Sequence, residues 1–483
     1  MVGRIEEIRQ LEKLYSSDRS EFVAIYGRRR VGKTYLVKEV FKDRMVFWHT
    51  GVSPYDGAKE NLMEDQLRAF HYNLIRYGLD EPKCPKDWIE AFNMLGRLIE
   101  NKTDLQGKKV IFIDELPWMD TARARFVPAF ENFFNDWVSK RDDILLVVCG
   151  SATSWIEDKL IHSKGGLYRR LTDTIHLKPF TLAECREYYL SIGVKMSEYD
   201  IAQSYMILGG IPFYMSFFDK EFSLAKNVDR LFFADDAKLE DEFNLLLGSL
   251  FINPEQYKSI IKFLSSRHSG YTRTEIVQGT KLPDGGGLTN QLKSLKAGNF
   301  IIDYIPFGEK RTKVHYRLSD SFCRFWLYFK ENRAIADTEY WQHNCNSPAL
   351  NSWRGISFEE LCLNNIRSIK KALEIGGVAS NESSLRIKGD DNRDGSQIDL
   401  LIDRADNVVN LCEMKFYNDE FRVTKEYSRK LNQRLNLVNG MIPKRKVVHM
   451  TLITTEGLAM NEYSGVFQHV ITLDQLFDGQ TIL

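Results

Sequence analysis

The stretch FVAIYGRRRVGKTYLVKEVF, residues 22–41, decides the fold of the first half of this chain. Its centre, residues 27–34, fits the pattern G-x-x-x-x-G-K-[ST], in which backbone N–H groups at a helix N-terminus surround phosphate oxygens. The apolar run before the loop predicts a buried strand, and YLVKEVF after it predicts a helix. The motif therefore has the strand–loop–helix context that it requires, and we predict a P-loop that binds ATP.

Two side chains of this loop have defined roles in phosphate binding. The pattern implies that the Lys33 ammonium reaches the β- and γ-phosphate oxygens and that the Thr34 hydroxyl binds Mg²⁺. A glycine-rich turn without a ligand is the alternative, and the flanking strand and helix argue against it. The residues expected to contact the nucleotide are Gly27, Arg28, Arg29, Arg30, Val31, Gly32, Lys33, Thr34 and Tyr35.

Two acids end the apolar run KVIFIDEL at 109–116. A carboxylate at the end of a buried strand is costly unless it holds a cation, so Asp114 suits a ligand of Mg²⁺ or its water. Glu115 suits the base that activates the attacking water, although a pair of capping acids would give the same letters. Ser151, just after the run DILLVVCG at 143–150, is expected beside the γ-phosphate as a polar sensor; a turn serine is the alternative.

Five short apolar runs alternate with helical stretches up to residue 180, and this order predicts an α/β domain with a three-layer parallel sheet. The ATPase core is therefore expected over 1–180, followed by a helical lid over 181–250. The runs are FVAIYG (22–27), MVFWHTG (45–51), KVIFID (109–114), DILLVVCG (143–150) and TIHLKPF (174–180).

Residues 251–335 predict a winged helix, because three helical stretches precede the strand-like runs FIIDYIP and KVHYRL. Such a module can contact DNA phosphates or can pack structurally behind the nucleotide. The side chains that could contact DNA are Thr289, Asn290, Lys293, Lys296, Lys310, Arg311, Lys313 and Arg317. Residues 336–483 form a further expected domain, a small α/β unit.

Composition restricts the class of protein. The 483 residues are 43% hydrophobic and 27% charged, with 66 basic and 66 acidic side chains, so no global field attracts nucleic acid or an anionic membrane. The seven cysteines are scattered and never form C-x-x-C, which supports neither a disulfide framework nor a zinc site. No apolar run is long enough to span a bilayer. We expect a cytoplasmic protein without membrane contact.

Several further motifs occur around the P-loop: RRR inside the loop, DEL at 114–116, GS at 150–151, YRRLTDTIHLKPFT at 168–181 and LGGIPFY at 208–214. Together they resemble the archaeal-type ATPase family of the STAND branch of AAA-like NTPases, over residues 1 to about 330. The resemblance implies that Gly210 and Pro212 contact the adenine. It further implies a GR-x-x-E box near the base, which is matched by Gly3, Arg4 and Glu7. Arg169 and Arg170 are candidate arginine fingers, with a surface salt bridge as the alternative for each.

A second set of charged residues lies in SQIDLLIDRADNVVNLCEMKFY, residues 396–417, which predicts a β-hairpin. Glu413 and Lys415 alternate onto one face of their strand. With a turn centred on residues 405–406, Asp399 is expected opposite Cys412 and diagonal to Glu413. Two carboxylates that hold Mg²⁺ and a lysine that positions the attacking water are what a phosphodiesterase needs.

The context of this hairpin resembles the PD-(D/E)XK nuclease superfamily, in particular the C-terminal domain often fused to archaeal-type ATPases. An upstream helix carries Glu359 and Glu360, and a basic helix follows with Lys425, Arg429, Lys430 and Arg434. The resemblance implies a restriction-endonuclease-like fold in which Glu359, rather than Glu360, joins the metal ligands Asp399 and Glu413. A solvated edge hairpin and a nuclease fold that binds DNA without cutting it are the alternatives.

Two sets of catalytic residues on one chain suggest an ATP-binding and ATP-hydrolysing switch that controls a Mg²⁺-dependent nuclease-like domain acting on DNA. The cofactors are then ATP and Mg²⁺. One rival is a regulatory ATPase whose C-terminal domain only binds DNA or a protein. The other is an ATP-driven mover of DNA, which would form a dimer or ring; a homo-oligomer stays an open alternative.

Overall fold

The computed structural model describes residues 2–53, 62–102, 107–163, 165–167, 169–331, 335–387 and 396–478. The chain divides into two compact units. Unit 1 consists of Met1–Pro179, Asn244–Pro254 and Asn290–Asn299, and unit 2 of Phe180–Phe243, Glu255–Thr289 and Phe300–Leu483. The bounds of the four domains expected from the sequence follow chain order and stay predictions.

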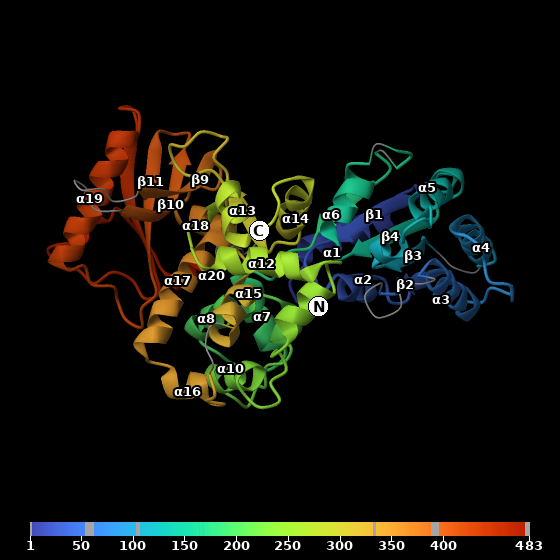
Figure 1. Ribbon diagram of the computed structural model, residues 1–483, viewed down its shortest axis with the longest axis horizontal. Helices are drawn as coiled ribbons and strands as arrows, with labels where there is room; N and C mark the ends of the chain where they lie inside the picture. The colour runs from blue at the N-terminus through green and yellow to red at the C-terminus, as the bar shows by residue number, and fades with distance from the viewer. Residues whose placement is uncertain are drawn as a thin grey trace. The chain divides into compact units, whose positions relative to one another are not determined.

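Unit 1 is built on a parallel sheet, as the alternation of apolar runs predicts. Over the described residues the sheet has five strands in the order β2-β3-β4-β1-β5, and every neighbouring pair is parallel (Figure 1). An α/β fold with a five-stranded parallel sheet is therefore confirmed. The strands are β1 (Glu21–Tyr26), β2 (Met45–Thr50), β3 (Lys109–Asp114), β4 (Ile144–Gly150) and β5 (Asp173–His176).

The central strands of this sheet are covered on both faces, since every residue of β3 and β4 is buried. On one face, apolar side chains of the sheet pack against an aromatic cluster from the crossover helices that includes Phe70, Trp88, Phe92 and Phe130. Continuous apolar runs are needed where a strand has no solvated face. The helices are α1 (Ile5–Tyr15), α2 (Lys33–Phe41), α3 (Leu62–Arg76), α4 (Trp88–Glu100), α5 (Phe126–Asp136) and α6 (Thr153–Ile156).

Unit 2 begins with helices. The first of them starts with a capping box in which Thr181 and Glu184 satisfy each other's backbone N–H groups. The described residues between 181 and 235 contain helices and no strand, in agreement with the sequence pattern. The helices are α7 (Leu182–Ser191), α8 (Glu198–Leu208), α9 (Pro212–Met215) and α10 (Leu224–Phe232); α11 (Glu242–Gly248) follows across the boundary between the units.

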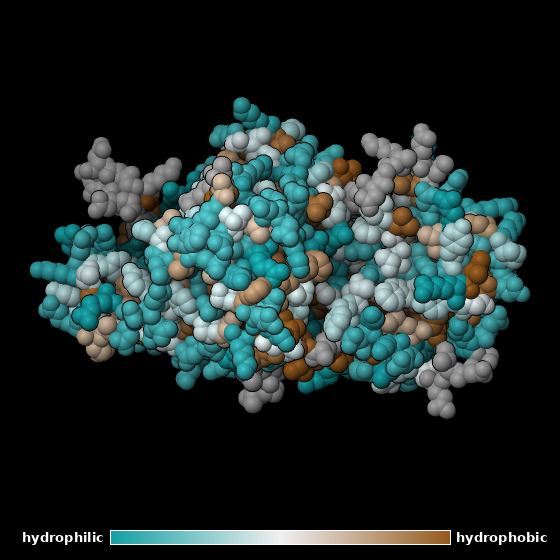
Figure 2. Space-filling view, turned by 90° about the horizontal axis from the view of Figure 1, so that it is seen from below, coloured by the Kyte–Doolittle hydropathy of each residue, from teal (hydrophilic) through white to brown (hydrophobic). Residues whose placement is uncertain are grey.

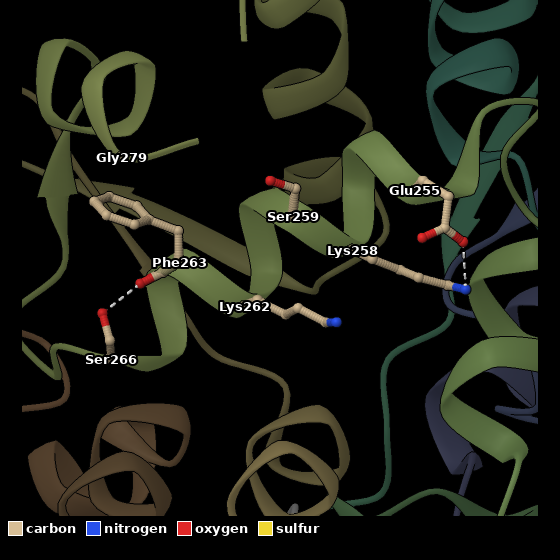
Figure 3. Close-up of a pocket in the computed structure, with 7 residues that line it drawn as sticks. All are labelled: Glu255, Lys258, Ser259, Lys262, Phe263, Ser266 and Gly279. Carbon is tan, nitrogen blue, oxygen red and sulfur yellow. Dashed lines mark hydrogen bonds and ion pairs between the residues drawn. The ribbon is translucent and has the colours of Figure 1, made fainter. Parts of the chain in front are cut away.

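The next segment has the order of elements expected of a winged helix. It runs α12 (Pro254–Ser265), β6 (Tyr271–Thr272), α13 (Arg273–Thr280), α14 (Gly286–Ala297), β7 (Ile301–Tyr304) and β8 (His315–Leu318), and its strands pair antiparallel in the order β6-β8-β7. From residue 290 onward α14 belongs to unit 1, where Lys293 pairs with Asp158. One face of α12 and Gly279 of α13 line a pocket (Figure 3).

The last part of unit 2 is a mixed sheet. Over the described residues its order is β13-β12-β11-β10-β9, with antiparallel pairs on the β9 side and parallel pairs on the β13 side. The strands are β9 (Ser380–Ile387), β10 (Ser396–Arg404), β11 (Val408–Lys415), β12 (Val447–Thr454) and β13 (His469–Ile471).

Helix α17 packs against β11, and α19 packs against β12. Leu431 and Val438 of α19 join the apolar core of this sheet. The helices of the region are α15 (Ser321–Trp326), α16 (Tyr340–Asn344), α17 (Pro348–Asn364), α18 (Ile366–Ala372), α19 (Lys425–Met441) and α20 (Leu473–Asp478).

The predicted register of the C-terminal hairpin is wrong by one residue. Leu400, not Asp399, is paired with Cys412, so one step further along the ladder Asp399 comes opposite Glu413. The cause is the turn: three residues, 405–407, separate the strands, and Asn407 has a left-handed backbone with φ 68°. Such three-residue loops shift the pairing relative to a two-residue turn.

Two other expectations need comment. Residues 388–395 of the predicted polar loop lie outside the described residues, and the strand β9 before it was not foreseen. The prediction that Arg317 lies on a DNA-contacting wing is wrong, because only 7% of this residue is exposed. Its guanidinium lies 3.9 Å from the buried Glu360, which also lies 3.5 Å from Arg324.

No helix in the described part of the chain is long and apolar enough to cross a membrane. The face seen in Figure 2 is mostly hydrophilic, with small hydrophobic patches among charged and polar residues. Surfaces of this kind are ordinary for a folded chain that keeps its apolar side chains in its cores.

We expect Glu360→Ala to destabilise unit 2 by about 3 to 5 kcal/mol, because it leaves Arg317 and Arg324 buried without their shared anion. Urea denaturation followed by circular dichroism measures this effect. Glu426→Ala, which removes the exposed partner of Lys430, should leave the urea midpoint unchanged. A wild-type midpoint in Glu360→Ala would mean that the two arginines have other partners.

Candidate functional site

The P-loop runs from the end of β1 to the start of α2. Gly27 has φ 142°, and a Cβ atom there would lie 2.3 Å from the carbonyl oxygen of Leu177, so only glycine fits. Gly32 caps α2 with φ 94°, and Arg30 between them is also left-handed at φ 73°. The loop is therefore curled tightly in front of a helix N-terminus, as phosphate binding by backbone N–H groups requires.

Lys33 is buried at the centre of this site. Its ammonium donates to the carbonyl oxygens of Gly27 (3.0 Å) and Arg28 (3.1 Å) and to Ser151 Oγ (3.0 Å). Burial lowers the pKa of Lys33, and the nearby Glu115 carboxylate opposes that shift. The sequence predicted Lys33 and Ser151 in one site, and the structure brings them into direct contact.

A chain of hydrogen bonds connects the remaining predicted groups. The Thr34 hydroxyl donates to Asp114 Oδ2 at 2.6 Å. Ser151 donates twice to Glu115, from its hydroxyl to Oε1 (2.6 Å) and from its backbone N–H to Oε2 (2.9 Å). Both Glu115 oxygens are thus fixed, and its backbone is left-handed at φ 46°. A carboxylate held in this way can orient a water molecule.

Burial, together with the adjacent Glu115, raises the pKa of Asp114 to about 6. Hydrogen bonds from the Thr34 hydroxyl and the Glu115 backbone N–H favour its charged form, and so does the positive charge of Lys33. A cation beside Asp114 and the Thr34 hydroxyl would relieve this penalty, and these oxygen donors suit Mg²⁺. The donor set therefore fits the magnesium ion that the motif implies.

The other predicted nucleotide contacts differ in exposure. Arg28 and Val31 are each 1% exposed, whereas Tyr35 is 56% exposed. Arg29 donates to the carbonyl oxygen of Ser249 at 3.5 Å, and its guanidinium lies over the Trp118 ring at 5.9 Å.

The N-terminal GR-x-x-E box contacts the loop directly. Arg4 donates to the carbonyl oxygen of Val31 at 3.2 Å, and its guanidinium lies 3.8 Å from Glu7. Arg169 and Arg170 are both exposed, and their role as arginine fingers stays a prediction.

Gly210 and Pro212 belong to unit 2, where local structure already accounts for both. Gly210 has φ 66°, its carbonyl accepts from the Phe180 N–H at 2.7 Å, and an added Cβ would lie 2.3 Å from the Phe180 carbonyl oxygen. Pro212 occupies the first position of α9, where proline is favoured. Their contact with adenine stays a prediction.

Unit 2 also brings together the predicted nuclease-like residues. Ligand atoms of His268, Glu359 and Asp399 lie within 4.8 Å of one another, a spacing that can hold a metal ion. Burial, followed by the Asp399 charge, raises the pKa of Glu359 to about 8. Burial also raises the pKa of Asp399, which accepts from Gln397 at 2.7 Å. Sequence reasoning missed His268, since RHSG at 267–270 matches no metal-binding motif.

Glu413 is held differently from the other carboxylates. Lys415 Nζ lies 2.8 Å from its Oε1, and Tyr427 and Arg434 of α19 also donate to it. Although burial opposes ionisation, Lys415 and Arg434 lower the pKa of Glu413, so it is a charged, paired side chain. The contact with Lys415 agrees with the prediction that both residues share one face of β11. The participation of Arg434 and Tyr427 was not foreseen.

An irregularity in β10 positions Asp399. The β9–β10 register shifts between Ile398 and Leu401, so β10 contains one more residue than its partner at this point. The strict alternation of faces is therefore interrupted between Ile398 and Leu401. Such bulges re-aim side chains at functional sites.

Comparison with known proteins agrees with the geometry of unit 1. A protein-family model, described as an ATPase domain predominantly from Archaea, matches residues 1–218. Residues 1–218 contain an archaeal-type ATPase domain. The chain is also 38% identical over 45 residues, 9% of its length, to an uncharacterized ATP-binding protein of Methanocaldococcus jannaschii, of which those residues cover 76%.

Two further similarities extend beyond the ATPase domain. An uncharacterized protein of Methanocaldococcus jannaschii is 25% identical over 450 residues, which cover 90% of this chain and 92% of that protein. The structure of the Walker-type ATPase of Pyrococcus abyssi aligns with a TM-score of 0.50 at 19% identity, over 68% of this chain and 96% of that chain. The latter similarity concerns the fold alone.

We expect Lys33→Ala in the ATPase domain to abolish ATP hydrolysis, because the buried ammonium that would meet the phosphates is removed. Phosphate release from ATP measures the effect. Lys38→Ala, on the exposed face of the same helix, should hydrolyse ATP like the wild type. Equal activity of both variants would contradict the assignment of the P-loop.

Glu115→Gln should reduce the turnover number for ATP by about 10²- to 10⁴-fold, the usual contribution of a general base. ATP binding should persist, since the amide keeps the shape of the side chain beside Ser151. Fluorescent-nucleotide titration and steady-state hydrolysis separate the two properties, with the exposed Glu39→Gln as control. Wild-type turnover in Glu115→Gln would assign the base to another residue.

Proposed function

We propose that this chain is a nucleotide-controlled switch in which the ATPase domain governs a Mg²⁺-dependent, nuclease-like C-terminal domain that acts on DNA. The observation that carries the proposal is the convergence of Glu359, Asp399, Glu413 and Lys415 within one compact unit. The same chain has the hydrogen-bonded Lys33, Thr34, Asp114, Glu115 and Ser151 site of an ATPase. A relative that extends over both halves supports their joint action.

In the ATPase domain, Thr34 and Asp114 would hold Mg²⁺, which neutralises phosphate charge when it is bound. Lys33 would exchange its bonds to the loop carbonyls for phosphate oxygens. Glu115, fixed by Ser151, would accept a proton from the attacking water. The loop backbone would thus bind ATP, and a pre-oriented carboxylate would activate the water that hydrolyses it.

In the C-terminal unit, Asp399 and Glu359 are the carboxylates that would hold a divalent cation. Both have raised pKa values in a partly buried site, and a cation would offset the repulsion between them. The bound ion would supply charge stabilisation for a phosphodiester and acidify its water. Lys415, held by Glu413, would orient that water on the same face of the sheet.

Exposed basic side chains support DNA as the substrate. Lys425, Arg429 and Lys430 are exposed on α19, the helix whose Arg434 contacts Glu413. Lys310 and Arg311 are exposed between β7 and β8, where a winged helix carries its wing. Phosphate contacts of this kind position a duplex without reading its sequence.

A second candidate function has a specific observation in its favour. Lys415, Arg434 and Tyr427 together satisfy the Glu413 carboxylate, so it has fewer lone pairs to offer a metal ion. A domain that binds DNA or a protein without cleavage, regulated by the same ATPase, would keep such a network for structure. Loss of cleavage and loss of stability in Glu413 variants distinguish the two functions.

The decisive test compares wild type, Lys33→Ala, Asp399→Asn and Lys415→Ala on supercoiled and linear DNA with Mg²⁺, with and without ATP. We expect the wild type to cut, and Asp399→Asn and Lys415→Ala to lose at least about 100-fold in rate while hydrolysing ATP normally. Asp406→Asn, on the exposed turn of the same hairpin, is the matched control.

The Lys33→Ala lane reports on nucleotide control. A change in cleavage with ATP that Lys33→Ala removes would support the switch. A cleavage rate that is unchanged by ATP and by Lys33→Ala would mean that the ATPase site does not control the nuclease-like site. If no DNA is cut in any lane while ATP is hydrolysed, the nuclease assignment is wrong and the binding function remains.

A further inference from the structure

We propose that His268 is a third ligand of the divalent cation held by Asp399 and Glu359, and that it makes this site prefer an imidazole-binding ion such as Co²⁺ or Mn²⁺ over Mg²⁺. The inference rests on the proposed cation-dependent function of the C-terminal unit and deepens it. His268 comes from the segment between α12 and β6, far in sequence from the nuclease-like region.

The geometry brings three different donor groups to one point. One ligand atom each of His268, Glu359 and Asp399 lies within 4.8 Å of the other two. His268 Nε2 lies 3.2 Å from Glu359 Oε2, an ion-pair distance, yet the two groups are not aligned as a hydrogen bond. Two carboxylates and one imidazole at open positions resemble the donor sets that bind first-row transition metals.

The imidazole has the properties that a metal ligand needs. Its two ring nitrogens are buried and have no hydrogen-bond partner among the described residues. Buried nitrogens of this kind carry a desolvation cost that a coordinated ion would offset. Burial and the cations Arg324 and Arg317 hold the pKa of His268 well below its usual range.

The turn that carries His268 is fixed from several sides. The Gly270 N–H donates to the Arg267 carbonyl at 3.0 Å, and the Arg267 guanidinium lies 3.6 Å from the Tyr271 ring centroid and 2.8 Å from Glu275. At the end of α12, the Ser266 hydroxyl donates to the Phe263 carbonyl (Figure 3). A ligand on a turn held in this way needs little reorganisation to bind metal.

The same turn is joined to the sheet that carries Asp399. Tyr304 of β7 donates to the Ser269 carbonyl, and Arg386 of β9 donates to Ser269 Oγ at 3.2 Å. Strand β9 is the antiparallel neighbour of β10, which contains Asp399. The distance between His268 and the two carboxylates is therefore set by bonds on both sides of the cluster.

An imidazole changes which ion the site selects. Mg²⁺ prefers oxygen ligands in octahedral geometry, whereas Co²⁺ and Mn²⁺ accept nitrogen and oxygen together. With His268 as a ligand, the site should bind Co²⁺ more tightly than Mg²⁺. Removing the imidazole should reduce this difference, because the remaining carboxylates suit either ion.

Isothermal titration calorimetry of the full-length chain with CoCl₂ and with MgCl₂, without nucleotide or DNA, tests the proposal. The variants are His268→Ala, His268→Gln, Asp399→Asn and His162→Ala, the last a matched control that removes an exposed histidine of unit 1. We expect Asp399→Asn to abolish the Co²⁺ site. Both His268 variants should raise its dissociation constant at least about ten-fold and change that for Mg²⁺ less than about two-fold.

The outcomes separate this inference from the proposed function. Loss of the Co²⁺ site in Asp399→Asn with wild-type affinity in both His268 variants overturns the role of His268 and leaves the carboxylate site intact. Identical Co²⁺ binding in wild type and Asp399→Asn overturns the cation site itself. Circular dichroism and the urea midpoint identify a His268 variant that has not folded, and the Gln variant then keeps the test decisive.

Discussion

The ATPase site of unit 1 depends on the hydrogen bonds of the buried Lys33 ammonium. One cation connects the carbonyls of the P-loop to Ser151 after β4, and Ser151 in turn fixes Glu115 after β3. Strands that lie side by side in a parallel sheet bring their carboxyl ends to the same edge, so residues far apart in sequence become one site. Charge burial at this edge is costly, and only the mutual contacts of these groups make it tolerable.

The C-terminal sheet also buries charged side chains, but with a different balance of positive and negative groups. Its Glu413 carboxylate is satisfied by Lys415, Arg434 and Tyr427. The charge of Lys415 also acts on Asp399 and Glu359, but burial outweighs it and raises the pKa of both. The negative charge of Glu413 is thus balanced by neighbouring cations, whereas the charges of Asp399 and Glu359 are balanced only in part. That asymmetry indicates where an additional positive charge belongs, and it separates the side chains that bind a ligand from those that support them.

The sequence was informative wherever one local pattern implies one structure. The P-loop with its flanking strand and helix, the strands of unit 1 and the two acids at the end of β3 follow from short-range rules. The hairpin register failed because a two-residue and a three-residue turn look alike until the backbone of Asn407 is known. The burial of Arg317 and the approach of His268 to Asp399 depend on long-range packing, which no pattern within either segment encodes.

The buried cluster of Arg317, Glu360 and Arg324 has a consequence for the temperature response of unit 2. Dehydrating charged groups becomes less costly as temperature rises, while the apolar contribution per unit of buried area levels off. Relative to the hydrophobic core around β11 and β12, this cluster therefore supports the fold more in the warm than in the cold. Cooling weakens the core and makes the three buried charges more costly at the same time, so this cluster contributes least to the stability of unit 2 at low temperature.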